Sequence, residues 1–348
     1  MYCSPVGLKN FKKRSSKMQT KNIKRQYNLH INWYLRCLSF YFLNSLLSIQ
    51  LSFSQNIDCP SSHPELLITS SSLQYSLTPE ESKLPPVIRA LLIAYQDSIE
   101  TAMTLENSKG ILRLKNNLEH PWSSPQHRFN LQTWRSLSKQ QQTKLWQNLG
   151  FKNFEHALNK ATLSEQFLQI YPKHNTLPKT FLPKNFEPGR LRDEVFFKKI
   201  YGMSKAEVAK SLRTIHWGKQ RLKVTSLHQI DKRLSAIHKD LKRCFKRFKR
   251  YYEPSAGTFH WRMIKGTSRL SVHSFGAAID IGVKYSNYWK WTLKVYGVDR
   301  QGLIPYKNNF PWQIVKVFER YGFIWGGWWY HHDTMHFEYR PELLIDID

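Results

Sequence analysis

Acidic residues are scarce in this chain of 348 residues, because 25 Asp and Glu stand against 53 Lys and Arg and give a formal net charge of +28. The first 55 residues hold nine Lys or Arg and no acid, so the remainder still carries +19. A basic exterior indicates an anionic partner, which could be nucleic acid, a membrane surface or a carboxylate- and phosphate-bearing cell envelope. No base-reading module is visible, so we expect no nucleic-acid partner.

Cysteine is scarce as well. The four cysteines, Cys3, Cys37, Cys59 and Cys244, contain no C-x-x-C pair, which excludes the common cysteine-based zinc sites. An exported chain that lost its N-terminal segment would keep Cys59 and Cys244. These two could pair in an oxidising compartment.

Long apolar runs are absent except near the N-terminus, where the run over 38–53 is broken by Asn44 and Gln50. A basic stretch, an apolar stretch and small polar residues predict a secretory signal over residues 1–55, and an internal start at Met18 would give it a more ordinary length. The alternative is an uncleaved membrane anchor, since the run is near the lower limit for spanning. We expect export to the periplasm or cell envelope.

Two short segments carry the chemistry. Ser271 to Asp280 reads S-V-H-S-F-G-A-A-I-D, and 53 residues after Asp280 the chain reads D-T-M-H. Catalytic zinc sites use three protein ligands and leave the fourth position to water, which His273, Asp280 and His336 fit. The alternation after Gly276 predicts a strand on which Asp280 shares its face only with small residues. Gly276 itself would allow the sharp turn that brings His273 into the same cleft.

A second metal pattern overlaps the first, because His332, Asp333 and His336 spell H-D-x-x-H, close to the helical H-E-x-x-H zinc motif. On a helix, His332 and His336 would share a face. The flanking glycines and aromatic residues favour a strand over a helix, so we place His331 and His332 around the site or at the surface.

The two segments resemble the VanY-like D-alanyl-D-alanine carboxypeptidases and L-alanyl-D-glutamate peptidases, the LAS group of zinc peptidases. That family shows S-x-H-x-x-G-x-A-x-D, then an acidic residue three positions before a His that often continues H-F. The matching positions are Ser271, His273, Gly276, Ala278, Asp280, Asp333, His336 and Phe337. Eight typed positions in two blocks make the resemblance specific.

The resemblance implies a mechanism and a cofactor, Zn²⁺. Zinc held by two imidazoles and one carboxylate would activate a water and polarise the peptide carbonyl. Asp333 would be the general base that later protonates the leaving amine. The family also has an Arg near the scissile carbonyl, for which we favour Arg262 over Arg269. Many members have Glu where this chain has Asp333, and the Asp variant resembles the endopeptidase branch more closely.

The fold class expected from the pattern and the resemblance is α+β, a small antiparallel sheet with flanking helices as in hedgehog-like DD-peptidases, over residues 186–348. Residues 56–185 are expected to be mainly helical, because an apolar stripe runs from Val87 to Ile99 at helical spacing. A second stripe, from Leu227 to Phe248, could bind a surface or pack on the sheet with a solvated basic back, and we favour packing. Strands are expected at 221–225 and 336–339, with a helix near 312–321.

The hypothesis is therefore an exported zinc metallopeptidase that hydrolyses peptidoglycan stem peptides, as a D,D-carboxypeptidase or as an endopeptidase. A second hypothesis is a non-catalytic cell-wall-binding protein that keeps the fold. A third, nucleic-acid binding, would predict salt-sensitive association with DNA that survives chelation. The anionic cell envelope and, through the N-terminal segment, a membrane are the expected surroundings.

Overall fold

A computed structural model describes residues 59–68, 77–106, 108–173 and 181–346 of the chain. The chain divides into two units, Met1–Cys59 and Pro60–Asp348, and the predicted signal or anchor at 1–55 lies outside the described residues. Within the described ranges, none of the helices combines the length and apolar composition needed to cross a membrane. The two cysteines in these ranges, Cys59 and Cys244, are both disulfide-bonded.

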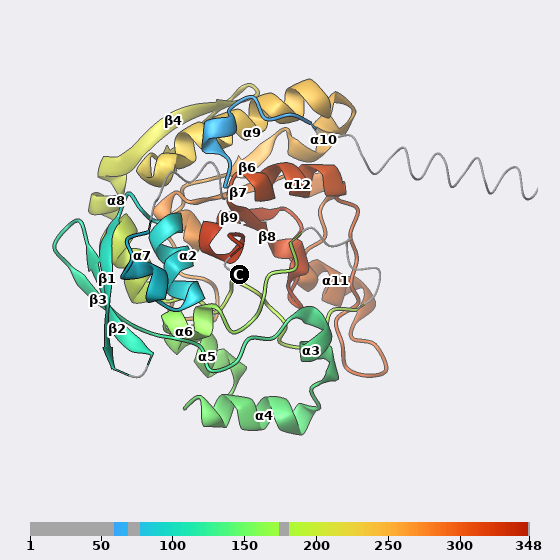
Figure 1. The fold of residues 1–348 in the computed structure, drawn as a ribbon. Coiled ribbons are helices and arrows are strands. Elements are labelled where there is room, and N and C mark those ends of the chain that lie inside the picture. The colour runs from blue at the N-terminus through green and yellow to red at the C-terminus, as the bar shows by residue number, and fades with distance from the viewer. Residues whose placement is uncertain (1–58, 69–76, 107, 174–180, 347–348) are drawn as a thin grey trace, which may run out of the picture. The chain divides into compact units, whose positions relative to one another are not determined.

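A four-stranded antiparallel sheet lies at the centre of the second unit (Figure 1). Its order is β6-β7-β9-β8, with β6 at Ser255–Gly257, β7 at Ala278–Ile281, β9 at His336–Tyr339 and β8 at Phe323–Trp325. The sequence predicted β7 and β9 at these places. Phe337 of β9 stacks on Phe318 with ring centroids 4.0 Å apart, which anchors the sheet in an aromatic core.

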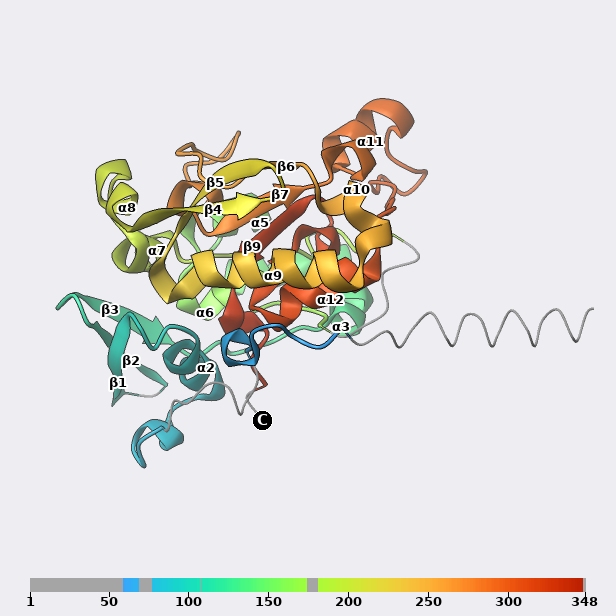
Figure 2. The same cartoon turned by 90° about the horizontal axis from the view of Figure 1, so that it is seen from above.

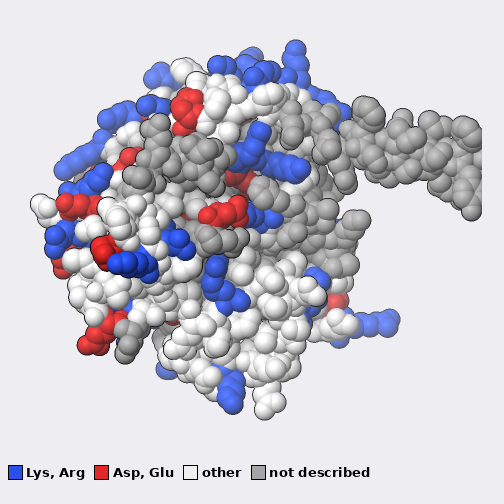
Figure 3. All heavy atoms as spheres, viewed as in Figure 1, with Lys and Arg blue, Asp and Glu red and all other residues white. Residues whose placement is uncertain are grey.

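Two helices pack beside this sheet, α9 (Ile230–Cys244) and α12 (Trp312–Arg320). They contact each other, α12 lies against β8, and α9 lies against the two-stranded antiparallel sheet of β4 (Leu212–Trp217) and β5 (Gln220–Thr225). Three apolar residues of α9, Leu234, Ile237 and Leu241, are fully buried. The lysines on its other side are exposed, and Figure 3 shows Lys and Arg gathered along that edge. The structure therefore agrees with packing for this stripe.

The region 56–185 contains helices, as predicted, and also a three-stranded antiparallel sheet that the sequence analysis missed. The helices are α2 (Pro86–Ala94), α3 (Leu131–Ser136), α4 (Lys139–Asn148), α5 (Phe154–Lys160) and α6 (Leu163–Gln166), and the strands are β1 (Ile99–Glu106), β2 (Lys109–Leu114) and β3 (Glu119–Ser123). The predicted helical stripe was too long, because α2 ends at Ala94 and Ile99 is the first residue of β1. Helices still outnumber strands in the described part of this region, so the sheet is an addition to the predicted helices.

The remaining helices are α7 (Glu194–Tyr201), α8 (Lys205–Ser211), α10 (Lys249–Tyr252) and α11 (Trp289–Tyr296). The predicted boundary at residue 186 stays a prediction, although buried hydrogen bonds join the two sides. Tyr171 Oη donates to Glu319 Oε1 at 2.7 Å, and Gln166 Nε2 donates to Glu342 Oε1 at 3.0 Å. The architecture of the described residues is a mixture of helices and small antiparallel sheets, compatible with the α+β class.

Candidate metal centre

Adjacent strands present two of the three predicted ligands. Asp280 of β7 and His336 of β9 are direct register partners, so their side chains leave the same face of the sheet. His273 lies in the short helical turn just before β7, and Gly276 turns the chain back with φ +67°. A Cβ on Gly276 would approach the Thr225 nitrogen to 2.9 Å, so this turn requires glycine.

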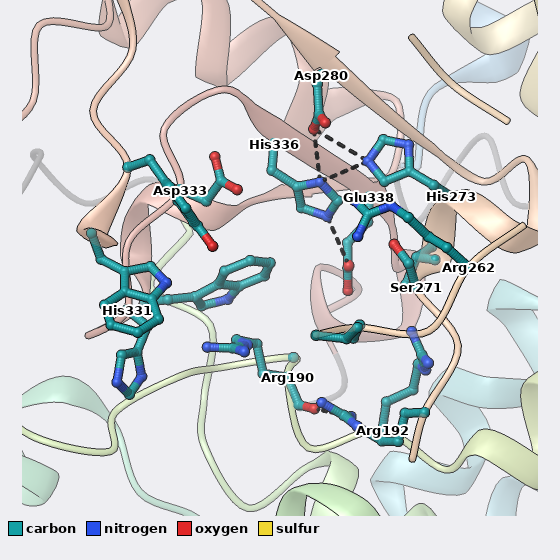
Figure 4. Close-up of a pocket in the computed structure, with 17 residues that line it drawn as sticks. Arg190, Arg192, Arg262, Ser271, His273, Asp280, His331, Asp333, His336 and Glu338 are labelled. Carbon is teal, nitrogen blue, oxygen red and sulfur yellow. Dashed lines mark hydrogen bonds and ion pairs between the residues drawn. The ribbon is translucent and has the colours of Figure 1, made fainter. Parts of the chain in front are cut away.

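The three side chains converge on one point (Figure 4). His273 Nε2 lies 3.2 Å from His336 Nδ1 and 3.2 Å from Asp280 Oδ1, and His336 Nδ1 lies 3.0 Å from Asp280 Oδ1. Both imidazoles are buried and Asp280 is partly buried. The structure thus brings together all three ligands that the sequence predicted.

Outer partners fix which nitrogen of each imidazole faces the others. His273 Nδ1 lies 2.6 Å from the carbonyl oxygen of Thr258, which can only accept, so this nitrogen donates. His336 Nε2 lies 3.0 Å from Glu338 Oε2. Although burial opposes ionisation, His336 and Arg340 lower the pKa of Glu338 to about 2, so His336 Nε2 also donates. The inward atoms are then two imidazole lone pairs and a carboxylate oxygen.

Three converging lone pairs require a cation between them. Burial disfavours the charged imidazolium, yet Asp280 and Glu338 together raise the pKa of His336 to about 10. Burial also disfavours the Asp280 carboxylate, but the two imidazoles hold the pKa of Asp280 well below its ordinary range. The site therefore favours either a proton or a metal ion. Two imidazoles, each with an outer hydrogen-bond partner, and one carboxylate fit a catalytic zinc site.

Asp333, the predicted general base, lines the same cleft (Figure 4). Burial, and then the charge of Asp280, raises the pKa of Asp333 to about 6. Its Oδ1 is buried and has no hydrogen-bond partner among the described residues. A buried carboxylate oxygen without a partner beside a cation site is placed to take a proton from a bound molecule.

Four arginines line the cleft, Arg190, Arg192, Arg262 and Arg269. Arg262 is exposed, and its backbone is held by Ser274, whose Oγ accepts from the Arg262 nitrogen at 2.9 Å. Arg269 is buried and donates from Nη1 to the carbonyl of Arg190 at 2.6 Å. Burial, together with Arg192 and Arg190, lowers the pKa of Arg269 to about 9. Arg262 is thus the freer of the two candidates, and its catalytic role stays a prediction.

The H-D-x-x-H alternative does not form a metal site in the described residues. The segment from His332 to Met335 is not helical. His332 is fully buried and its Nε2 lies 3.3 Å from Thr292 Oγ1, outside the group of three ligands. His331 lines the cleft and contacts Glu187, as expected for a residue around the site.

Sequence reasoning missed Thr258, Glu338 and Arg190. Glu338 could have been found, since it is two residues after His336 and therefore on the same face of β9. Thr258 acts through a backbone carbonyl, which has no sequence signature. Arg190 contacts Glu187 and lies over the ring of Trp329 at 5.4 Å, and only the tertiary fold brings these residues to the cleft.

The chain was also compared with known proteins. Residues 265–339 match the D-alanyl-D-alanine carboxypeptidase family. The match contains His273, Asp280, Asp333 and His336, and begins three residues after Arg262. No curated protein and no solved structure matched the chain. The similarity to this family therefore covers this segment, which contains the site just described.

Proposed function

We propose that the chain is a zinc-dependent peptidase that hydrolyses peptidoglycan peptides, as a D-Ala-D-Ala carboxypeptidase or as an L-Ala-D-Glu-type endopeptidase. One observation carries the proposal. Two imidazole lone pairs, fixed in direction by Thr258 and Glu338, converge with an oxygen of Asp280 beside the unpartnered carboxylate oxygen of Asp333. The family match to residues 265–339 supports peptide bonds as the target.

His273 Nε2, Asp280 Oδ1 and His336 Nδ1 would hold the zinc, which when bound polarises a carbonyl and makes water more acidic. Asp333 accepts a proton from the attacking water and delivers it to the leaving amine, a role suited to its pKa of about 6. Arg262 stabilises the negative oxygen that develops on the scissile carbonyl. Glu338 and the Thr258 carbonyl keep both imidazoles in the required tautomer.

The setting that we propose is the periplasm or cell envelope, reached by export through residues 1–55. The net charge of +28 suits an anionic envelope. Disulfide bonding of Cys59 and Cys244 suits an oxidising compartment.

The test is digestion of purified peptidoglycan by the zinc-loaded full chain, with mass spectrometry of the released products. We expect cleavage by the wild type and by His332→Ala, and none by Asp280→Ala. Asp333→Asn should retain zinc yet lose 10²- to 10⁴-fold in rate, as is typical when a general base is removed. The product mass would identify the bond. If well-folded, zinc-loaded wild type cleaves no wall type, a non-catalytic wall-binding protein becomes the better description.

A further inference from the structure

Exposed apolar side chains gather on α11 and the turn that follows it. Trp291 is 46% exposed, Val295 69%, Tyr296 56% and Val298 55%. Trp291 and Val295 are four residues apart and therefore neighbours on one helix face. Figure 2 shows α11 standing out from the body of the unit, where no other labelled helix or strand covers it. These four side chains, here called the α11 patch, leave an unusual amount of apolar surface in water.

Cations surround the α11 patch. Lys290 and Lys294 are exposed on the same helix, and Arg300 is exposed just after the turn. Lys307 Nζ lies 3.6 Å from the centroid of the Tyr296 ring. The only acid between residues 286 and 316 is Asp299, whose Oδ1 accepts from the backbone nitrogens of Gln301 and Leu303. The α11 patch thus combines exposed apolar side chains with positively charged residues around them.

A second exposed apolar group provides a contrast. Met103 and Leu105 on β1 are 38% and 64% exposed, but Glu100 and Glu106 on the same strand offset the cations of the neighbouring strand β2, such as Lys109, the register partner of Glu106. The mixed charge there does not favour an anionic surface. Apolar exposure alone therefore does not distinguish the α11 patch; its combination with an excess of lysine and arginine over acids does.

We propose that the α11 patch docks on the surface of an anionic lipid bilayer. Trp and Tyr are enriched at the level of lipid headgroups, aliphatic side chains enter the acyl boundary, and lysines bind the headgroup charges. A polyanionic polymer would bind the lysines but leave Val295 and Val298 in water. A lipid surface would contact both the lysines and these apolar side chains. The helix lies on this surface and does not span it, since it has eight residues.

The helix α11 begins at the wall of the cleft, so docking of α11 would also affect the cleft. The helix begins at Trp289, and Trp289 and Tyr288 line the cleft that holds His273, Asp280 and His336. A docked α11 therefore places one wall of that cleft next to the bilayer. This proposal does not depend on peptidase activity.

The test is hydrogen–deuterium exchange of the full chain, read by peptide, with vesicles of phosphatidylglycerol and, separately, of phosphatidylcholine. We expect exchange over residues 291–303 to slow at least threefold with phosphatidylglycerol and not with phosphatidylcholine. The double variant Val295→Glu/Val298→Glu should abolish the effect, because it adds two anions to exposed positions without touching the core. Leu105→Glu, an equally exposed apolar-to-acid change, should leave it intact. Reading each segment separately keeps any membrane binding by residues 1–55 out of the result.

Three outcomes would overturn the proposal. The first is unchanged exchange over 291–303 with phosphatidylglycerol vesicles, and the second is slowing that persists in Val295→Glu/Val298→Glu. The third is equal slowing by a soluble polyphosphate, which would assign the cations to a polymer and leave no role for the apolar side chains. Thermal unfolding and zinc binding of both variants should match the wild type, which shows that each is folded.

Discussion

In two histidines of this protein, one ring nitrogen lies beside a glutamate carboxylate, but the second ring nitrogen has different neighbours in each. His336 Nε2 lies 3.0 Å from Glu338, and His238 Nε2 lies 2.8 Å from Glu253. Only His336 turns its second nitrogen toward another histidine and an aspartate. A carboxylate partner therefore does not by itself make a histidine a metal ligand. In a histidine that is a ligand, the carboxylate sets which tautomer is present.

Glu338→Gln should lower zinc affinity 10- to 100-fold, because the charge that orients His336 and raises its basicity is removed. The measurement is competition for zinc against a chelator of known affinity. Glu253→Gln removes the carboxylate that partners His238 and should leave zinc affinity unchanged. Equal affinity in the wild type and Glu338→Gln would show that the zinc site does not need this partner.

His228 should make the protein sensitive to mild acid. Burial, and then the charge of Arg233, lowers the pKa of His228 to about 3, below its ordinary value of 6.5. Between these values the unfolded chain binds a proton that the folded chain does not, so the contribution of His228 to stability is constant well above pH 6.5 and falls as the pH drops below it. From pH 7 to pH 5 this costs about 2 kcal/mol.

Urea unfolding at pH 7 and pH 5 measures that loss. The variant His228→Asn removes the titrating group, and Asn tolerates the positive φ of this position. The wild type should lose about 2 kcal/mol more than His228→Asn between the two pH values. Identical losses would show that His228 does not control acid stability.

Individual site residues were predictable where side-chain chemistry and short spacing coincide. His273 and Asp280 are seven residues apart with a glycine between them, and Asp333 precedes His336 by three. Both pairs are therefore close enough in sequence to belong to short motifs. The carbonyl of Thr258 and the arginine Arg190 come from distant segments. Their positions depend on packing, which no local pattern contains.

At the scale of elements, the turn into β7 determines where His273 lies. Gly276 adopts φ +67°, and an added Cβ would meet Leu212 Cδ2 at 2.8 Å and the Thr225 nitrogen at 2.9 Å. Left-handed backbone and a close neighbour thus act together at this position. A residue with a side chain would have to move the turn that presents His273.

Gly276→Ala should destabilise the protein by about 2–4 kcal/mol and weaken zinc binding. Gly150→Ala is the matched control, since Gly150 also has a positive φ, +80°, but nothing lies within 4 Å of its added Cβ. That control should cost about 1–2 kcal/mol and leave zinc affinity unchanged. Equal effects of the two changes in unfolding and zinc titration would argue against the steric role of Leu212 and Thr225.

Elements were predicted best where one periodicity dominates. The stripe of α9 and the alternation around β7 are of this kind, and both were found within a few residues. In the segment 87–99 a helical stripe runs directly into a strand, because Ile99 continues the spacing of α2 while belonging to β1. Periodicity alone could not separate them, so the start of β1 was missed.

For the whole molecule, charged residues after β9 are buried against the region 56–185. Glu342, 1% exposed, accepts from Tyr95 Oη at 2.8 Å and from Gln166 Nε2 at 3.0 Å. Arg340 is fully buried between Glu338 and Glu342. The chain of contacts from His336 through Glu338 and Arg340 therefore ends in the N-terminal region.

A fragment of residues 186–348 should not fold cooperatively. Each buried hydrogen bond that it loses costs about 1–3 kcal/mol, and apolar surface is exposed as well. Far-ultraviolet circular dichroism during heating, with zinc titration, would compare it with residues 56–348, which keep both disulfide-bonded cysteines. The longer chain should show one sharp transition. A cooperative, zinc-binding 186–348 fragment would instead establish the predicted boundary as that of an independent domain.

The direct pairing of Asp280 with His336 across β7 and β9 also bears on how the sheet reaches its correct alignment. A slip of β9 by one residue would turn His336 to the opposite face and bring Phe337 opposite Asp280. Misaligned sheets would then lack one of the three groups that meet a cation, because only His336 lies on β9. Any ion that binds there selects the correctly aligned strands during folding, so metal supply should affect the yield of folded protein as well as its activity.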